Sequence, residues 1–163
     1  MKKVAIYTDG SCRFNPGPGG WGAVLLTKIK TFKNQPLETP LICFRRLAGY
    51  GGSRTTNNIM ELTAIAEALK AIKDENVEIR IHTDSQYCIG VLSLGWNAKE
   101  NKALISSIRK QLSRFPNLKF VKVKGHSGDR WNEEVHKIAN YAVDGQSSID
   151  EYDTEETDEK ELF

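Results

Sequence analysis

The spacing of apolar residues changes once along this chain, near Ile59, and this change restricts the fold more than any other feature. Before it, short apolar runs predict strands at residues 4–8, 21–27 and 41–48. A glycine- and proline-rich turn joins the first two, and a polar loop at residues 28–40 precedes the third. Three consecutive strands joined by loops indicate an antiparallel meander.

From Ile59 onward the period is helical, and the polar side chains at 56–58 are suited to cap the helix over 59–72. Strands that return through helical crossovers tend to run parallel, so we predict an α/β fold with a five-stranded mixed sheet flanked by helices. The remaining expected elements are strands at 77–83 and 118–123, a short helix ending near Leu92, a helix over 100–114 and a last helix beginning near Asp129.

Charge divides the chain into two parts. Residues 146–163 carry eight acids and one base, whereas the rest of the chain has a net charge of +9. Because the acidic segment has almost no apolar residues before Leu162, we predict a domain at residues 1–145 and a disordered tail at 146–163. The basic body favours a polyanionic partner, although a solvated lysine-rich surface accounts for its charge equally well.

The composition predicts a cytoplasmic monomer that does not bind membranes. No stretch approaches the roughly 20 apolar residues that span a bilayer, and the N-terminus lacks a signal-peptide core. Cys12, Cys43 and Cys88 form no metal-type pair and leave an odd thiol in any disulfide scheme, which favours a reducing compartment. Met1 and the acidic end favour a free-standing chain.

Two similar sequence segments, YTDGS and HTDSQ, each place an aspartate where an apolar strand ends. If the two strands are neighbours, Asp9 and Asp84 converge beyond their carboxyl ends, where ligand sites form in open sheets. Glu61 lies beside the apolar stripe of the first helix, so we expect it to point toward the same sheet edge. The alternative is that these residues are two caps and a surface glutamate.

Three carboxylates in one shallow site repel one another unless a proton or a cation compensates. Oxygen ligands favour Mg²⁺ or Mn²⁺. A pair of such ions can activate water on one side of a phosphodiester and stabilise the leaving oxygen on the other. The acids therefore favour a nuclease with two divalent ions.

Five motifs carry a family resemblance: YTDGSC at residues 7–12, NPGPGGWGA at 15–23, TTNNIMEL at 55–62, TDSQY at 83–87 and VKGHSG at 123–128. In this order, over residues 3–144, they resemble the type 1 ribonuclease H family. The resemblance implies an endonuclease that cuts the RNA strand of RNA/DNA hybrids and leaves 3′-hydroxyl and 5′-phosphate ends. It implies that Asp9, Glu61 and Asp84 are metal-ligating catalytic residues and that His126 assists proton transfer or product release.

The chain departs from the family pattern at one acidic position. The family usually has an aspartate ten residues after the loop histidine, and this chain has His136 there. His136 is expected to ligate the second ion or to orient a water beside it. Alternatively, Glu133 supplies the carboxylate, or the site is weakened and the protein only binds hybrids.

The resemblance also implies residues that contact the substrate. Amides and hydroxyls can distinguish RNA from DNA through the 2′-hydroxyl. The alternative is that the amides satisfy loop backbone and that Trp96 packs in the core. The expected contacts are Asn15, Asn57, Asn58 and Gln86 in the minor groove, Arg54 and Thr56 on a DNA phosphate, and Gly10, Ser11 and Cys12 in the first motif. Because aromatic side chains suit nucleic acid, Trp96 is expected to stack on a sugar or to line the groove for the DNA strand.

The stretch between Asp84 and His126 leaves no room for the extra basic helix that some family members carry. Hybrid affinity is therefore expected to come from other basic side chains. The candidates are Lys28, Lys30 and Lys33 in the 28–40 loop, and Lys99 and Lys102 near Trp96. The same fold also occurs in the nuclease parts of reverse transcriptases and in integrase-like proteins, which is a rival interpretation.

Overall fold

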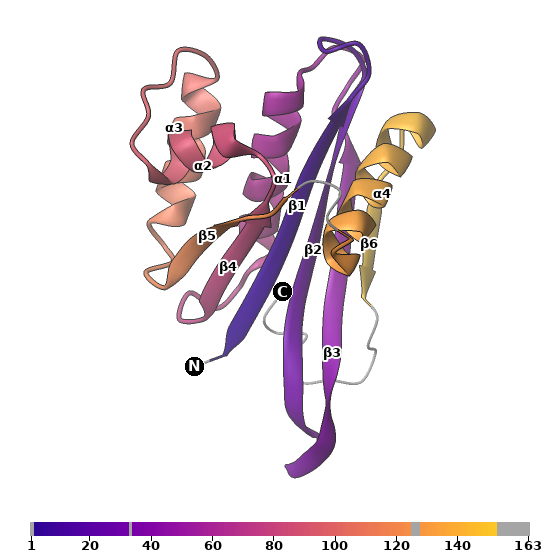
Figure 1. The fold of residues 1–163 in the computed structure, drawn as a ribbon, viewed down its shortest axis with the longest axis vertical. Coiled ribbons are helices and arrows are strands. Elements are labelled where there is room, and N and C mark those ends of the chain that lie inside the picture. The colour runs from indigo at the N-terminus through magenta and orange to yellow at the C-terminus, as the bar shows by residue number, and fades with distance from the viewer. Residues whose placement is uncertain (1, 33, 125–127, 153–163) are drawn as a thin grey trace.

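A six-stranded mixed sheet with helices on both faces forms the protein, as the computed structural model shows for residues 2–32, 34–124 and 128–152 (Figure 1). The strand order is β5-β4-β1-β2-β3-β6. Pairing is antiparallel from β1 through β2 and β3 to β6, and parallel between β1, β4 and β5. The strands are β1 (Lys3–Cys12), β2 (Gly19–Phe32), β3 (Gln35–Tyr50), β4 (Glu78–Thr83), β5 (Leu118–Lys122) and β6 (Ile149–Tyr152).

The helices bury the two faces of the sheet in separate clusters. Val4 and Ile6 of β1 pack with the α1 side of the core, and Tyr7 packs with the α4 side. Alternate residues of a strand point to opposite faces, so β1 serves both clusters. None of the described helices is long and apolar enough to cross a membrane. The helices are α1 (Asn57–Ala71), α2 (Gln86–Ser93), α3 (Lys102–Leu112) and α4 (Arg130–Gly145).

Side chains fix the N-termini of three helices. The Thr56 hydroxyl accepts from the Ile59 amide, and Asp129 accepts from two amides at the start of α4. Ser85 caps α2 by accepting from the amide of Cys88. Such caps satisfy amides that lack partners within the helix. The predicted caps of the first and last helices are therefore confirmed.

The predicted loop at residues 28–40 is wrong. β2 continues to Phe32 and β3 begins at Gln35, so Lys28 and Lys30 lie on a long two-stranded ribbon rather than in a loop. Lys33 lies outside the described residues. Asn34 takes the left-handed conformation, with φ of 61°, where the strands connect, and asparagine tolerates this conformation.

A sixth strand replaces the start of the expected disordered tail. Ile149–Tyr152 pairs with β3, and the Arg45 guanidinium donates twice to Asp150 at 2.8 Å. The same hydrogen bonds hold the pKa of Asp150 below its usual value. Asp150 and Glu151, which contributed to the prediction of disorder, thus form ion pairs with Arg45 and Arg46 of β3. Residues 153–163 lie outside the described part of the chain.

Candidate active site

Asp9 and Asp84 converge because their strands are parallel neighbours. Tyr7 on β1 pairs with His82 on β4, so the two aspartates, each two residues further, occupy equivalent positions at the strands' carboxyl ends. The side chain of Asp9 is held from the backbone, since the Gly10 amide donates to its Oδ1 at 3.0 Å. This confirms the predicted convergence of Asp9 and Asp84, which was based on the two similar segments at the ends of their strands.

Glu61 reaches the same place because α1 packs very close to β1. A Cβ on Gly10 would lie 2.5 Å from the backbone nitrogen of Glu61 and 2.7 Å from the carbonyl carbon of Met60. Only a glycine permits this approach. One carboxylate oxygen from each of Asp9, Glu61 and Asp84 lies within 4.8 Å of the others, an arrangement that can hold a metal ion.

The three carboxylates repel one another in a poorly solvated site. Burial raises the pKa of Glu61 well above its ordinary value, and the charges of Asp9 and Asp84 add to this effect. Burial also raises the pKa of Asp9, although a hydrogen bond with His136 opposes that shift. Glu61 Oε2 is buried and has no hydrogen-bond partner among the residues that the structure describes. A buried acceptor among like charges is suited to a cation, so the residues present fit a divalent metal.

These shifts predict that Glu61→Gln stabilises the metal-free protein near neutral pH. A raised pKa in the folded state gives stability that is complete below the unfolded value and is lost as pH rises through the folded value. Glutamine carries no charge, so we expect its Tm at pH 7 to exceed that of the parent by about 3 °C or more. The difference should disappear near pH 4. Melting curves in a chelator test this, and a gain that is independent of pH would contradict it.

His136, on α4, is linked to the site by a hydrogen bond with Asp9. Its Nδ1 lies 2.8 Å from Asp9 Oδ2, so each oxygen of Asp9 has a hydrogen-bonding partner. The carboxylates that meet within 4.8 Å do not include Glu133, which is exposed on the same helix. His126 lies outside the described residues.

Several expected substrate contacts hold the loops around the site together. Asn15 Oδ1 accepts from the Asn57 amide at 2.9 Å, and Ser11 donates to Asn140 at 2.6 Å. Thr56 caps α1. The Cys12 thiol lies within 4.0 Å of three backbone carbonyls. The side chains of Arg54, Asn57, Asn58 and Gln86 are exposed, and their contact with substrate stays a prediction.

Trp96 combines packing with exposure. A Cβ on Gly90 would lie 2.1 Å from its ring, so the indole lies against α2, yet 46% of the residue is exposed. Arg109 also donates to its carbonyl oxygen at 3.3 Å. Trp96 is thus fixed in place with part of its surface open to solvent.

Two further groups near the carboxylates have no distinctive motif in the sequence. The Lys122 ammonium donates to the backbone carbonyl of Asp84, because β5 pairs with β4 at Thr83. On the other side, Arg13 donates to Asn140 and forms a bidentate pair with Asp144, which ties the first motif to α4. Lys122 could have been identified in the sequence as a lysine near the end of a predicted strand that is expected to lie beside the strand preceding Asp84.

Comparisons with known proteins agree with this geometry. A family model described as RNase H matches residues 1–144. The chain is 42% identical over 161 residues to Ribonuclease H of Syntrophomonas wolfei, covering 88% of this chain and 97% of that protein. It is 39% identical to Ribonuclease H of Caldicellulosiruptor saccharolyticus, with the same coverage of both chains.

Solved structures show the same likeness. The crystal structure of LC11-RNase H1 in complex with RNA/DNA hybrid matches with a TM-score of 0.65 and 27% identity, over 88% of this chain and 99% of that one. LC9-RNase H1, a type 1 RNase H with the type 2 active-site motif, matches with a TM-score of 0.74 and 28% identity, over 91% and 75%. The convergent acids, the fold and these matches together show that the chain belongs to the type 1 ribonuclease H family.

Proposed function

We propose that this protein is an endonuclease that hydrolyses the RNA strand of RNA/DNA hybrids and leaves 3′-hydroxyl and 5′-phosphate ends. The observation that carries the proposal is the meeting of Asp9, Glu61 and Asp84 within 4.8 Å at the end of parallel strands. The hybrid bound by LC11-RNase H1 supports the choice of substrate. The exposed residues Arg54, Asn57, Asn58, Gln86 and Trp96 are the chain's candidates for holding the hybrid.

Two divalent ions, Mg²⁺ or Mn²⁺, would be held by Asp9, Glu61 and Asp84. Such ions supply charge stabilisation for phosphodiester hydrolysis. The chain's own task is to hold its carboxylates in place before substrate arrives. The Gly10 amide fixes one oxygen of Asp9, and the close approach of α1 to β1 brings Glu61 alongside.

His136 acts in this proposal as a positioning residue for Asp9. An ionised Asp9 accepts, so Nδ1–H of His136 donates to it at 2.8 Å and adds no negative charge. The imidazole also offers a nitrogen ligand, which suits Mn²⁺ better than Mg²⁺. A direct bond from His136 to the second ion, and proton transfer by His126, remain predictions.

We expect His136→Asp to raise cleavage in Mg²⁺ by about tenfold and to change cleavage in Mn²⁺ little, because it adds a hard oxygen ligand. Cleavage rates across concentrations of each metal measure this. His136→Asn is the matched control, because asparagine has the same size as aspartate but carries no charge. A parent fully active in Mg²⁺, with no gain in the aspartate variant, would show that this position does not limit metal use.

A single-turnover assay with an end-labelled hybrid tests the function itself. We expect metal-dependent cuts within the RNA strand, with an intact DNA strand and the stated ends on the fragments. The competing function is a hybrid-binding protein weakened by the replacement of the fourth acid with His136. That function predicts that the hybrid is retained but uncut in both metals.

A further inference from the structure

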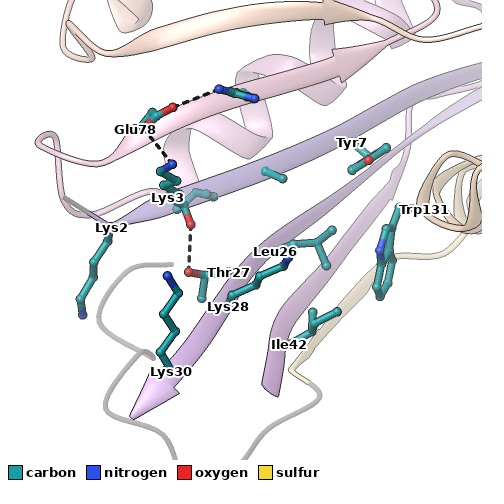
Figure 2. A pocket seen from close by; sticks show the side chains of 13 residues that line it. Lys2, Lys3, Tyr7, Leu26, Thr27, Lys28, Lys30, Ile42, Glu78 and Trp131 are labelled. Atoms are coloured by element: carbon teal, nitrogen blue, oxygen red, sulfur yellow. Dashed lines mark hydrogen bonds and ion pairs between the residues drawn. The ribbon is translucent and has the colours of Figure 1, made fainter. Parts of the chain in front are cut away.

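A groove on the α4 face of the sheet is lined by residues other than the three clustered carboxylates (Figure 2). Its volume is about 740 Å³. On β1, Lys3, Ala5, Tyr7 and Asp9 alternate onto one face, so the groove and Asp9 share a side of the sheet. Its rim is basic, with Lys2, Lys3, Lys28, Lys30 and Arg80, and its floor includes Ala5, Leu26, Ile42 and Trp131.

The positive charge of this groove exceeds the negative charge around it. Glu78 is the one acid among the described residues that line the groove, and it lies 3.9 Å from Lys3 and 3.4 Å from Arg80. Lys28 and Lys30 are exposed on β2, and within the described part of the chain neither has an acidic partner. The groove therefore fits an acidic occupant.

The chain's own C-terminal segment begins beside this groove. β6 runs antiparallel to β3 and reaches Tyr152 opposite Arg45, so its direction continues toward Ile42 at the groove. Residues 153–163 span at most roughly 36–40 Å when extended, whereas Ile42 lies about 10 Å along β3 from Arg45. The segment is long enough to cross the cavity.

The composition of this segment complements the groove. Residues 153–163 contain six acids and one lysine and end in Leu162 and Phe163. We propose that residues 153–163 dock in this groove, with their carboxylates on the basic rim and the terminal apolar pair on the floor. The preceding residues already show the same chemistry, since Asp150 is bound by Arg45.

A nucleic acid is the other polyanion that this basic groove could attract. The tail is favoured because its tether to β6 gives it an effective concentration in the millimolar range, which a separate molecule does not have. The tail also offers apolar side chains for the floor, whereas a phosphate backbone does not. These differences make the two occupants experimentally separable.

Carbodiimide cross-linking of the full chain tests the proposal without any substitution. The reagent joins a carboxylate to a lysine amine as an amide where the two are in contact. At low salt, peptide mapping of the monomer should find links from residues 153–163 to Lys28 and Lys30, falling at least fivefold at 0.5 M salt. Links to Lys73 and Lys110, which are exposed elsewhere, serve as the control. Equal linking to all four lysines would overturn the proposal.

Charge reversal gives a second readout in the full chain. In Lys28→Glu/Lys30→Glu, the backbone amide signals of residues 153–163 should shift toward their high-salt positions, whereas Lys73→Glu/Lys110→Glu should leave them unchanged. Unmoved tail signals would overturn the proposal. Unmoved signals together with a severalfold loss of hybrid affinity would assign the groove to nucleic acid instead.

Discussion

Replacing Asp9 with asparagine should lower hybrid cleavage by about a thousandfold while leaving the protein folded. Asp9 lies between the other two carboxylates and His136, and it is only 6% exposed. Asparagine keeps the shape but removes the charge that a divalent ion requires. A loss of about 4 kcal/mol in transition-state stabilisation corresponds to this factor. Single-turnover rates in saturating Mg²⁺ and Mn²⁺ measure it.

The control for this substitution is Asp74→Asn. Asp74 is an exposed aspartate whose side chain accepts from the Asn76 amide, a role that asparagine can also perform. Its rate should match that of the parent. If Asp9→Asn retained more than about a tenth of the activity with unchanged metal dependence, the acidic cluster would not be the catalytic centre.

Gly10→Ala should both unfold the protein more easily and impair cleavage. The new methyl group would meet the backbone of Met60 and Glu61 at 2.5–2.7 Å, and backbone cannot move aside as a flexible side chain can. Separating α1 from β1 costs about 2–4 kcal/mol and moves Glu61 away from Asp9. Thermal melting, with cleavage measured well below the Tm, separates the two effects.

Gly145→Ala provides the matched control. The nearest atom to its added Cβ is the Ser147 hydroxyl at 3.0 Å, at the end of a small side chain that can rotate. This variant should melt within about 2 °C of the parent. Similar losses in both variants would mean that the contact between β1 and α1 is not tight in solution.

The acidic centre could be predicted because its signals are local. An aspartate that follows an apolar strand is visible in the sequence, and parallel pairing then places Asp9 and Asp84 together. Glu61 was recognisable from its place beside the helical stripe. The partner of Asp9 was not predictable at this level, because the contact with His136 depends on how α4 crosses the sheet.

The length of the β2–β3 ribbon and the sixth strand could not be predicted, for a different reason. Beyond the helices a ribbon need not bury a face, so residues 28–40 lack the alternation that marks a half-buried strand. Residues 149–152 form a strand in which Asp150 and Glu151 pair with arginines of β3, about a hundred positions away in the sequence. The composition of a segment indicates that it cannot form a stable structure by itself. It does not reveal which distant side chains will pair with its charges in the folded protein.

The three acids come from segments separated by up to 75 residues, which has a consequence for how the enzyme matures. The three carboxylates repel one another only when β1 has paired with β4 and α1 has docked. A partly folded chain is therefore not destabilised by this repulsion. Contacts this distant along the chain form late, because closing long loops is entropically slow. A partly assembled chain therefore lacks the cluster of three carboxylates, and we expect cleavage activity to return during refolding only after β1, β4 and α1 have come together.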